Sequence, residues 1–177
     1  MPIPNQIERK VSNFLVSKTD TKGKILYCND EFVAISGYAE RELLGKPHSI
    51  VRHPDMPRTI FKYLWDTLAQ GKEVNAYVKN MAKDGSYYWV FANVCPSSSS
   101  ANGQIVAYNS VRRCPSENGL NFVKELYPKL KQIEAKDINE GIAYIQEYFG
   151  AYKTTFAEAM LGLQVAGMCF SEVCAVK

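Results

Sequence analysis

The chain has 177 residues and a formal net charge of +3, and 46% of its residues are hydrophobic while 22% are charged. This composition is typical of a folded globular protein and excludes an intrinsically disordered chain. The small positive charge, without a dense run of Lys or Arg, argues against nucleic-acid binding. No stretch of about 20 uninterrupted apolar residues is present, which argues against a membrane span.

The two features that bear on the cellular compartment are the cysteines and the N-terminus. The chain has five cysteines, an odd number, and none forms the Cys-x-x-Cys spacing of a zinc site. The N-terminal segment, residues 1–13, contains Glu8, Arg9 and Lys10 and lacks the apolar core of a signal peptide. We therefore expect a cytoplasmic protein with reduced thiols.

Residues 14–113 are predicted to form one mixed unit. Two short apolar runs, 14–16 and 24–28, flank an Asp/Gly turn and indicate a β-hairpin. Two short helices follow, closed by Gly37 and Gly45. The prolines at positions 47, 54 and 57 exclude a regular helix in the next segment, residues 46–57. A helical period then runs to a stop at Gly71.

Three strands complete this unit. Residues 74–83 and 87–94 flank Asp84-Gly85, a strong hairpin signal, and residues 104–111 give the last strand. The order of the elements indicates an α+β fold, with an antiparallel sheet and helices grouped on one side.

Residues 114–177 are predicted to form a C-terminal helical extension without a motif of its own. Apolar residues trace one helix face from Leu120 to Ile133, and a heptad-like stripe runs from Ile138 to Leu163. Such a stripe fits a helix packed on the sheet or on a neighbouring helix. It equally fits an intermolecular interface, through which the chain would form a homodimer or contact a signalling partner.

The stretch from Asn29 to Asn93 resembles a known family. Its first part, which resembles the N-terminal half of a PAS domain, is Asn29-Asp30-Glu31-Phe32, Ser36-Gly37-Tyr38 and Glu42-Leu43-Leu44-Gly45. The more specific part is Pro47-His48, Val51-Arg52-His53-Pro54-Asp55-Met56-Pro57, Phe61, Trp65, Lys79-Asn80, Asp84-Gly85, Tyr88-Trp89-Val90 and Asn93. Together these residues resemble the PAS domain of bacterial aerotaxis receptors of the Aer type, over residues 14–113.

The resemblance implies a PAS fold, in which a five-stranded antiparallel sheet carries helices over one face and is followed by the helical extension. It implies that FAD is held non-covalently between the sheet and the helices. It further implies that oxygen or electron transport sets the redox state of the flavin and that the domain passes this state to a chemotaxis-type or other signalling partner. The chain is therefore expected to be a sensor rather than an enzyme.

The proline-rich loop supplies the first candidate cofactor ligands. With the resemblance, Arg52 is expected to clamp a phosphate and His53 to donate to a phosphate or to the ribose, while Asp55 orders Arg52 or caps the next helix. Without a cofactor, Arg52 and Asp55 would form a loop ion pair. Trp65 is expected either to stack on the cofactor or to lie in the core.

Amide side chains are candidates for reading the flavin ring. Asn29, Asn80 and Asn93 can each donate and accept hydrogen bonds, as the N3–H and the carbonyls of a flavin require. Asn29 can equally be a helix cap and Asn80 a turn residue. Tyr88 and Trp89 point to opposite faces of a strand, so only one of them can line a cleft, and we assign that place to Tyr88.

His48 completes the set of nine candidate residues. Because His48 and His53 are the only histidines, haem held by one of them is an alternative ligand, as is another small molecule. A cofactor-free interaction module is a second alternative. The loop from His48 to His53 contains no Cys, which argues against blue-light adduct chemistry on a thiol.

Overall fold

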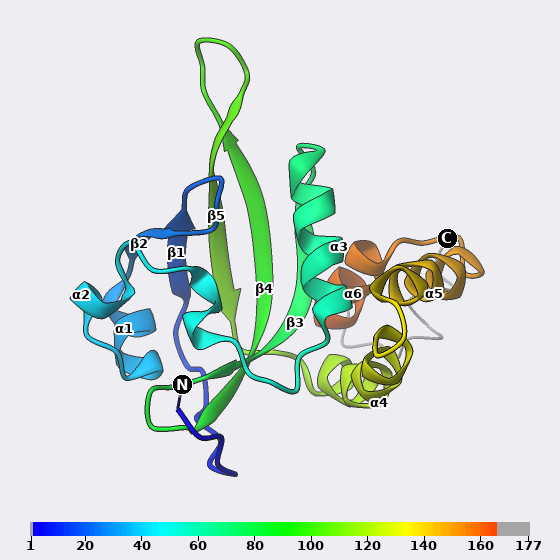
Figure 1. Cartoon of the computed structure of the whole chain (residues 1–177), viewed down its shortest axis with the longest axis horizontal. Helices are drawn as coiled ribbons and strands as arrows, with labels where there is room; N and C mark the ends of the chain where they lie inside the picture. Colours follow the sequence, from blue (N-terminus) through cyan, green and yellow to red (C-terminus); the bar gives the residue numbers. More distant parts are fainter. Residues whose placement is uncertain (1, 166–177) are drawn as a thin grey trace.

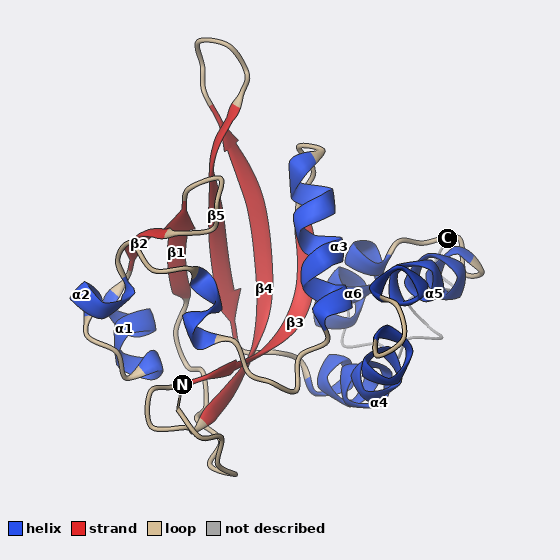
Figure 2. Ribbon diagram, viewed as in Figure 1, coloured by secondary structure: helices blue, strands red, loops and turns tan. Residues whose placement is uncertain are grey.

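The computed structural model describes residues 2–165, and Cys169 and Cys174 lie outside the described residues. Its centre is one antiparallel sheet with the strand order β2-β1-β5-β4-β3 (Figures 1 and 2). The strands are β1 (Leu15–Thr19), β2 (Ile25–Cys28), β3 (Val74–Met81), β4 (Tyr87–Ser98) and β5 (Ile105–Arg113). The central position of β5, the last strand, brings the two predicted hairpins into a single sheet.

Helices lie on both sides of this sheet in Figure 1. Those between β2 and β3 are α1 (Asp30–Ser36), α2 (Glu40–Leu43), the 3₁₀ turn η1 (His48–Val51) and α3 (Arg58–Ala69). Those after β5 are α4 (Glu117–Glu134), α5 (Ile138–Gly150) and α6 (Phe156–Val165). Within residues 2–165, no helix is both long enough and apolar enough to cross a membrane.

Local chemistry explains where these elements begin and turn. The Asn29 side chain accepts a hydrogen bond from Phe32 N at 3.2 Å and caps α1, as its residue type favours. The turn between β3 and β4 is formed by Asp84 and Gly85, and Gly85 has a φ of +87°, which few other residues adopt without strain.

The sheet has two covered faces because successive strand residues point in opposite directions. Asn80, Ala92 and Arg112 lie on the inner face, toward α1, η1 and α3. Tyr77 and Trp89 lie on the outer face, where the C-terminal extension packs. The Tyr127 hydroxyl of α4 donates to Tyr77 O at 2.5 Å, and its ring lies 6.3 Å from that of Trp89.

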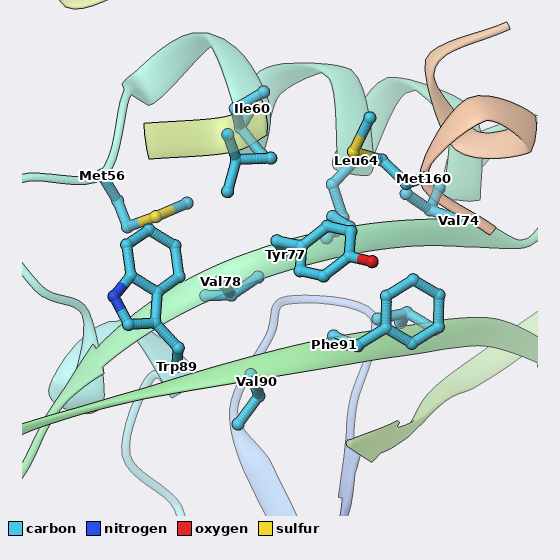
Figure 3. Packing of buried hydrophobic residues seen from close by; sticks show 14 of the residues in the cluster. Met56, Ile60, Leu64, Val74, Tyr77, Val78, Trp89, Val90, Phe91 and Met160 are labelled. Atoms are coloured by element: carbon cyan, nitrogen blue, oxygen red, sulfur yellow. The ribbon is translucent and has the colours of Figure 1, made fainter. Parts of the chain in front are cut away.

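The core continues from the sheet into the extension without a gap. Figure 3 shows buried residues from α3 and the loop before it, β3, β4 and α6 in a single cluster. The labelled members are Met56, Ile60, Leu64, Val74, Tyr77, Val78, Trp89, Val90, Phe91 and Met160. The extension is therefore packed on its own chain, through β3, α3 and the outer face of the sheet.

The apolar stripe from Ile138 to Leu163 is divided between two helices rather than one. The chain turns over residues 151–155, where Lys153 has a φ of +54°. Thr155 N then donates to Glu158 Oε2 at 2.9 Å, while Glu158 N donates to Thr155 Oγ1 at 3.2 Å. This reciprocal pair is a capping box, which starts α6 afresh.

Candidate functional site

A cleft of about 270 Å³ lies between the inner face of the sheet and α3, η1 and the β1–β2 turn. Four of the nine predicted site residues line it: His48, Arg52, Trp65 and Asn80. Arg112 and Tyr108 of β5 also line it, and the sequence analysis did not select them. The cleft is thus built from segments on both sides of α3 in the sequence.

Arg112 forms a cationic floor to this cleft. Its side chain is 2% exposed, and its Nη2 donates to Ser17 Oγ at 2.6 Å. Its guanidinium carbon lies 4.3 Å from the centre of the Phe32 ring. Among the described residues, no carboxylate oxygen lies within 4.0 Å of the guanidinium. Burial lowers the pKa of Arg112 to about 10, so the group stays charged at neutral pH.

His48 is the neutral neighbour of this cation. Its Nε2 lies 3.2 Å from Arg112 Nη1 and 3.2 Å from Ser17 Oγ. Burial, with the positive charge of Arg112 added, lowers the pKa of His48 to about 3. Because a guanidinium only donates, His48 Nε2 accepts from it, which places the ring proton on Nδ1. The ring stacks on Phe32 with 5.7 Å between centroids.

Three buried polar atoms on the inner face have no hydrogen-bond partner among residues 2–165: Asn80 Nδ2, the Tyr88 hydroxyl and Arg112 Nε. Asn80 and Tyr88 are paired across β3 and β4, and Arg112 follows on β5 opposite Ala92. Burial raises the pKa of Tyr88, so its hydroxyl remains a donor. A buried group left unsatisfied costs about 1–3 kcal/mol. These three atoms can each donate a hydrogen bond to an acceptor that lies against the inner face.

The mouth of the cleft combines aromatic and cationic side chains. Trp65 is 38% exposed, and its ring lies edge-on to Tyr108 with 5.4 Å between centroids. The Arg52 guanidinium lies 4.1 Å from the centre of the Phe61 ring, and burial lowers the pKa of Arg52. Lys22, in the β1–β2 turn, adds a second cation to the lining.

The family model described as the PAS fold matches residues 25–112. Residues 25–112 are a PAS domain. The α+β fold expected from the sequence, with its five-stranded antiparallel PAS sheet, is confirmed. The resemblance to aerotaxis receptors is confirmed by a relative from Escherichia coli (strain K12), the "Aerotaxis receptor". It is 39% identical over 137 residues, which are 77% of this chain and 27% of the receptor.

Other relatives place the PAS domain among sensory modules of signalling proteins. A nitrogen fixation regulatory protein of Klebsiella pneumoniae is 31% identical over 81 residues, which are 46% of this chain and 16% of that protein. The light-state structure of the blue-light photoreceptor Aureochrome1 LOV has a TM-score of 0.55 and 26% identity, over 66% of this chain and 91% of that one. The crystal structure of the PAS domain of a protein from Colwellia psychrerythraea has a TM-score of 0.52 and 22% identity. The match covers 57% of this chain and 85% of that one. The matched part of this chain spans 27% of the length of the aerotaxis receptor and 16% of the length of the nitrogen fixation regulatory protein.

Four of the other predicted residues lie away from the cleft of the PAS domain. His53 is 3% exposed, and its Nδ1 accepts from Asp55 N at 3.1 Å. The Asp55 carboxylate accepts from Lys79 Nζ at 2.6 Å, so it pairs with Lys79 rather than with Arg52. Together these contacts brace the loop that carries Arg52.

The two remaining amides also have partners of their own. Asn93 lies on the outer face, and its Nδ2 donates to Asn75 Oδ1 at 2.9 Å. Asn29 caps α1 and accepts from Val16 N at 2.9 Å, which ties β1 to that helix. Tyr88, the fifth residue outside the lining, is buried and lies next to Asn80 on the inner face, as its partner across β3 and β4.

Sequence reasoning missed Arg112 and Ser17, the two residues that hold His48. A signal was present, because alternation along β5 places Arg112 on the same face as Tyr108 and Ser110. A charged residue on the buried face of a strand is unusual and marks a possible site. The prediction followed the proline-rich loop instead, where charged residues are gathered in sequence.

No cysteine of the described residues lines the cleft. Cys28 is buried beside it, Cys95 is half-buried on the outer face, and Cys114 is exposed after β5. Burial raises the pKa of the Cys28 thiol. Over residues 2–165, no group of three or more His, Cys, Asp or Glu side chains is placed to hold a metal ion.

Proposed function

We propose that this chain is a flavin-binding sensory module, which holds FAD non-covalently in the PAS cleft and reports oxygen or redox state to a signalling partner. The observation that carries the proposal is a set of buried donors without partners within residues 2–165. Asn80 Nδ2 and Arg112 Nε belong to residues that line the cleft, and the Tyr88 hydroxyl lies next to Asn80 on the same face of the sheet. Arg112 is also a cation, and no described carboxylate oxygen lies within 4.0 Å of it.

The donor set fits the flavin ring. The pyrimidine edge of an isoalloxazine carries carbonyl oxygens and ring nitrogens that accept hydrogen bonds, and its N3–H requires an acceptor. Asn80 can meet both needs with one amide, while Arg112 donates from the floor of the cleft. A bound flavin supplies the reversible uptake of electrons and protons, and Arg112 favours electron-rich states through its uncompensated charge.

The mouth fits the remainder of a dinucleotide. Arg52 and Lys22 are cations at the lining, and a guanidinium is well suited to phosphate oxygens. The exposed face of Trp65 is available for stacking on a flat ring. We propose that His53 and Asp55 act on FAD through the loop, by holding Arg52 in place, and not by contact.

The route to a partner begins at β5. Arg112 contacts the cleft, and two residues later the chain leaves the sheet toward α4. We propose that hydrogen bonds of Asn80 and Arg112 rearrange when the charge in the cleft changes, and that β5 moves with them. The relatedness to an aerotaxis receptor supports a chemotaxis-type partner, a cytoplasmic location and a role in sensing rather than in catalysis.

An absorption spectrum of the purified protein tests the proposal. We expect the visible bands of oxidised flavin, bleached by dithionite and restored by air, and chromatography of the heat-released cofactor should give FAD. A haem spectrum would replace the proposal with the haem alternative. Protein that stays colourless after incubation with FAD, and with FMN, would leave a cofactor-free interaction module.

A further inference from the structure

Helix α3 borders the cleft on one side and packs against α4 and α5 of the C-terminal extension on the other. Figure 1 shows α3 next to the helices of the extension. Phe61, Leu64 and Trp65 of α3 line the cleft. Thr59 and Tyr63 face the extension, where the Tyr63 ring lies 5.2 Å from that of Phe156 in α6. A change in the position of α3 therefore alters the cleft wall and the contact with the extension together.

A single buried carboxylate from the extension holds the start of α3. Glu134, the last residue of α4, is 6% exposed. Its Oε1 accepts from Arg58 N at 3.0 Å, and its Oε2 accepts from Thr59 N at 2.7 Å and from Thr59 Oγ1 at 2.8 Å. Pro57, which precedes α3, supplies no cap of its own. Glu134 thus performs the capping that the local sequence of α3 leaves open.

The same region carries Arg52 at the mouth of the cleft. Arg52 Nη2 donates to Met56 O at 3.4 Å, and its guanidinium lies over Phe61 in the first turn of α3. Lys131 of α4 donates to Pro54 O at 2.7 Å, within the same loop. Burial lowers the pKa of Arg52, and the charge of Glu134 opposes that change. Two side chains of α4 therefore hold the segment from which Arg52 projects.

We infer that Glu134 is a positioning residue for the cofactor cleft, and that through it cofactor binding and docking of the extension stabilise each other. This inference rests on the proposed function, because it assigns a residue to the same cleft. The carboxylate makes no contact with the cleft itself. It acts by fixing the first turn of α3 and the Arg52 loop.

The approach of α5 to the same turn supports this arrangement. A Cβ at Gly141 of α5 would collide with the side chain of Thr59. Thr59 is fully buried and is held by Glu134. Because Thr59 cannot turn away without losing that hydrogen bond, α4, α5 and α3 are fixed as one unit at this point.

The test compares full-length wild-type protein with Glu134→Gln and with Glu125→Gln. Glu125 is an exposed residue of the same helix and serves as the matched control. In Glu134→Gln an NH₂ group faces backbone donors and the charge is lost. We expect its FAD dissociation constant to rise about fivefold to tenfold, with an altered visible circular dichroism of the bound flavin, and no change in Glu125→Gln.

A reciprocal measurement needs no variant. If binding and docking are coupled, FAD must slow amide hydrogen exchange in α4 and α5 of the wild-type protein, since coupling free energy is shared by both sites. Equal FAD affinity and equal flavin dichroism in all three proteins would overturn the inference, as would unchanged exchange in α4 and α5 on saturation with FAD. Wild-type protein that binds no FAD would instead contradict the proposed function, and the inference would fall with it.

Discussion

A buried cation without an acidic partner among the described residues is the feature that most sets this cleft apart at the scale of single residues. Replacing a buried charge by a neutral group is often neutral or stabilising, because the charge is no longer removed from water. Within the part of the chain that the structure describes, Arg112 is held by Ser17, His48 and the Phe32 ring, none of which is acidic. The stability of the ligand-free protein therefore gives little reason for an arginine here, whereas an electron-rich ligand does.

Arg112→Gln is expected to weaken FAD binding at least tenfold, because it removes a charged donor worth about 1.5–3 kcal/mol in a hydrogen bond. The midpoint of thermal unfolding of flavin-free protein should stay unchanged or rise. Titration with FAD and thermal unfolding check the two parts. Arg113→Gln, on the exposed neighbour, is the control and should retain full affinity. Equal affinity in both variants would contradict a cofactor role for Arg112.

His48 makes the stability of the protein depend on pH. Its folded pKa of about 3 lies below the usual 6.5, so the unfolded state binds one more proton between these values. Stability is fully present above pH 6.5 and falls as the pH is lowered from 6.5 to about 3, by up to about 1.4 kcal/mol per pH unit.

His48→Asn should remove this contribution and flatten the decline relative to wild type. Urea unfolding at several pH values between about 5 and 7 measures the difference. Protein freed of flavin is needed, since a bound ligand adds to the stability of the folded state. Parallel pH profiles for the two proteins would show that His48 is not buried as a neutral group.

At the scale of elements, features encoded within a few residues were predictable from the sequence. The Asp84-Gly85 turn, the Asn29 cap and the period of α3 all lie where the sequence placed them. The site was only partly predictable, because its floor joins residues distant in sequence. Ser17, His48 and Arg112 meet only when β1, η1 and β5 have assembled. Similarly, no local pattern shows that Glu134 will cap a helix 75 residues earlier.

Gly141 and Gly150 show, within one helix, that a local sequence pattern does not reveal which residues contact distant parts of the chain. Both glycines weaken α5 because glycine has a low helix propensity. A Cβ at Gly141 would collide with the Thr59 side chain, whereas a Cβ at Gly150 would have no described atom within 4 Å. Gly141→Ala is expected to destabilise the protein by about 1–3 kcal/mol through overpacking. Gly150→Ala should be neutral or stabilise it by up to about 1 kcal/mol. Urea unfolding of both variants checks this. Equal effects of the two substitutions would show that α5 does not approach α3 this closely.

At the scale of the whole molecule, the sheet and the extension share one hydrophobic core. The cluster joins Tyr77 and Phe91 of the sheet to Phe149 and Phe156 of the extension. Close contacts cross this boundary at its start as well, where Tyr77 Oη and Ser116 Oγ lie 2.8 Å apart and a Cβ at Gly119 would collide with the Tyr77 ring.

Unfolding of the whole chain is therefore expected to be a single cooperative transition. Trp65 lies on the side of the cleft, whereas Trp89 contacts Tyr127 of α4, so tryptophan fluorescence reports the PAS unit together with its contact with the extension. Far-ultraviolet circular dichroism also reports α4, α5 and α6. The two signals should give the same midpoint in urea. A separate loss of helical signal at lower urea concentration would show that the extension folds independently.

The position of α3 between the cleft and the extension also restricts which substitutions this segment can accept. On a helix with one exposed face, only about half the positions are fixed by packing. In α3, Leu64 and Trp65 line the cleft, whereas Thr59 and Tyr63 contact the C-terminal extension. Few positions of α3 are therefore free to vary. In a saturation mutagenesis scan, α3 should tolerate fewer amino acids per position than α5. The helix that connects the two halves is thus expected to change most slowly as the sequence diversifies.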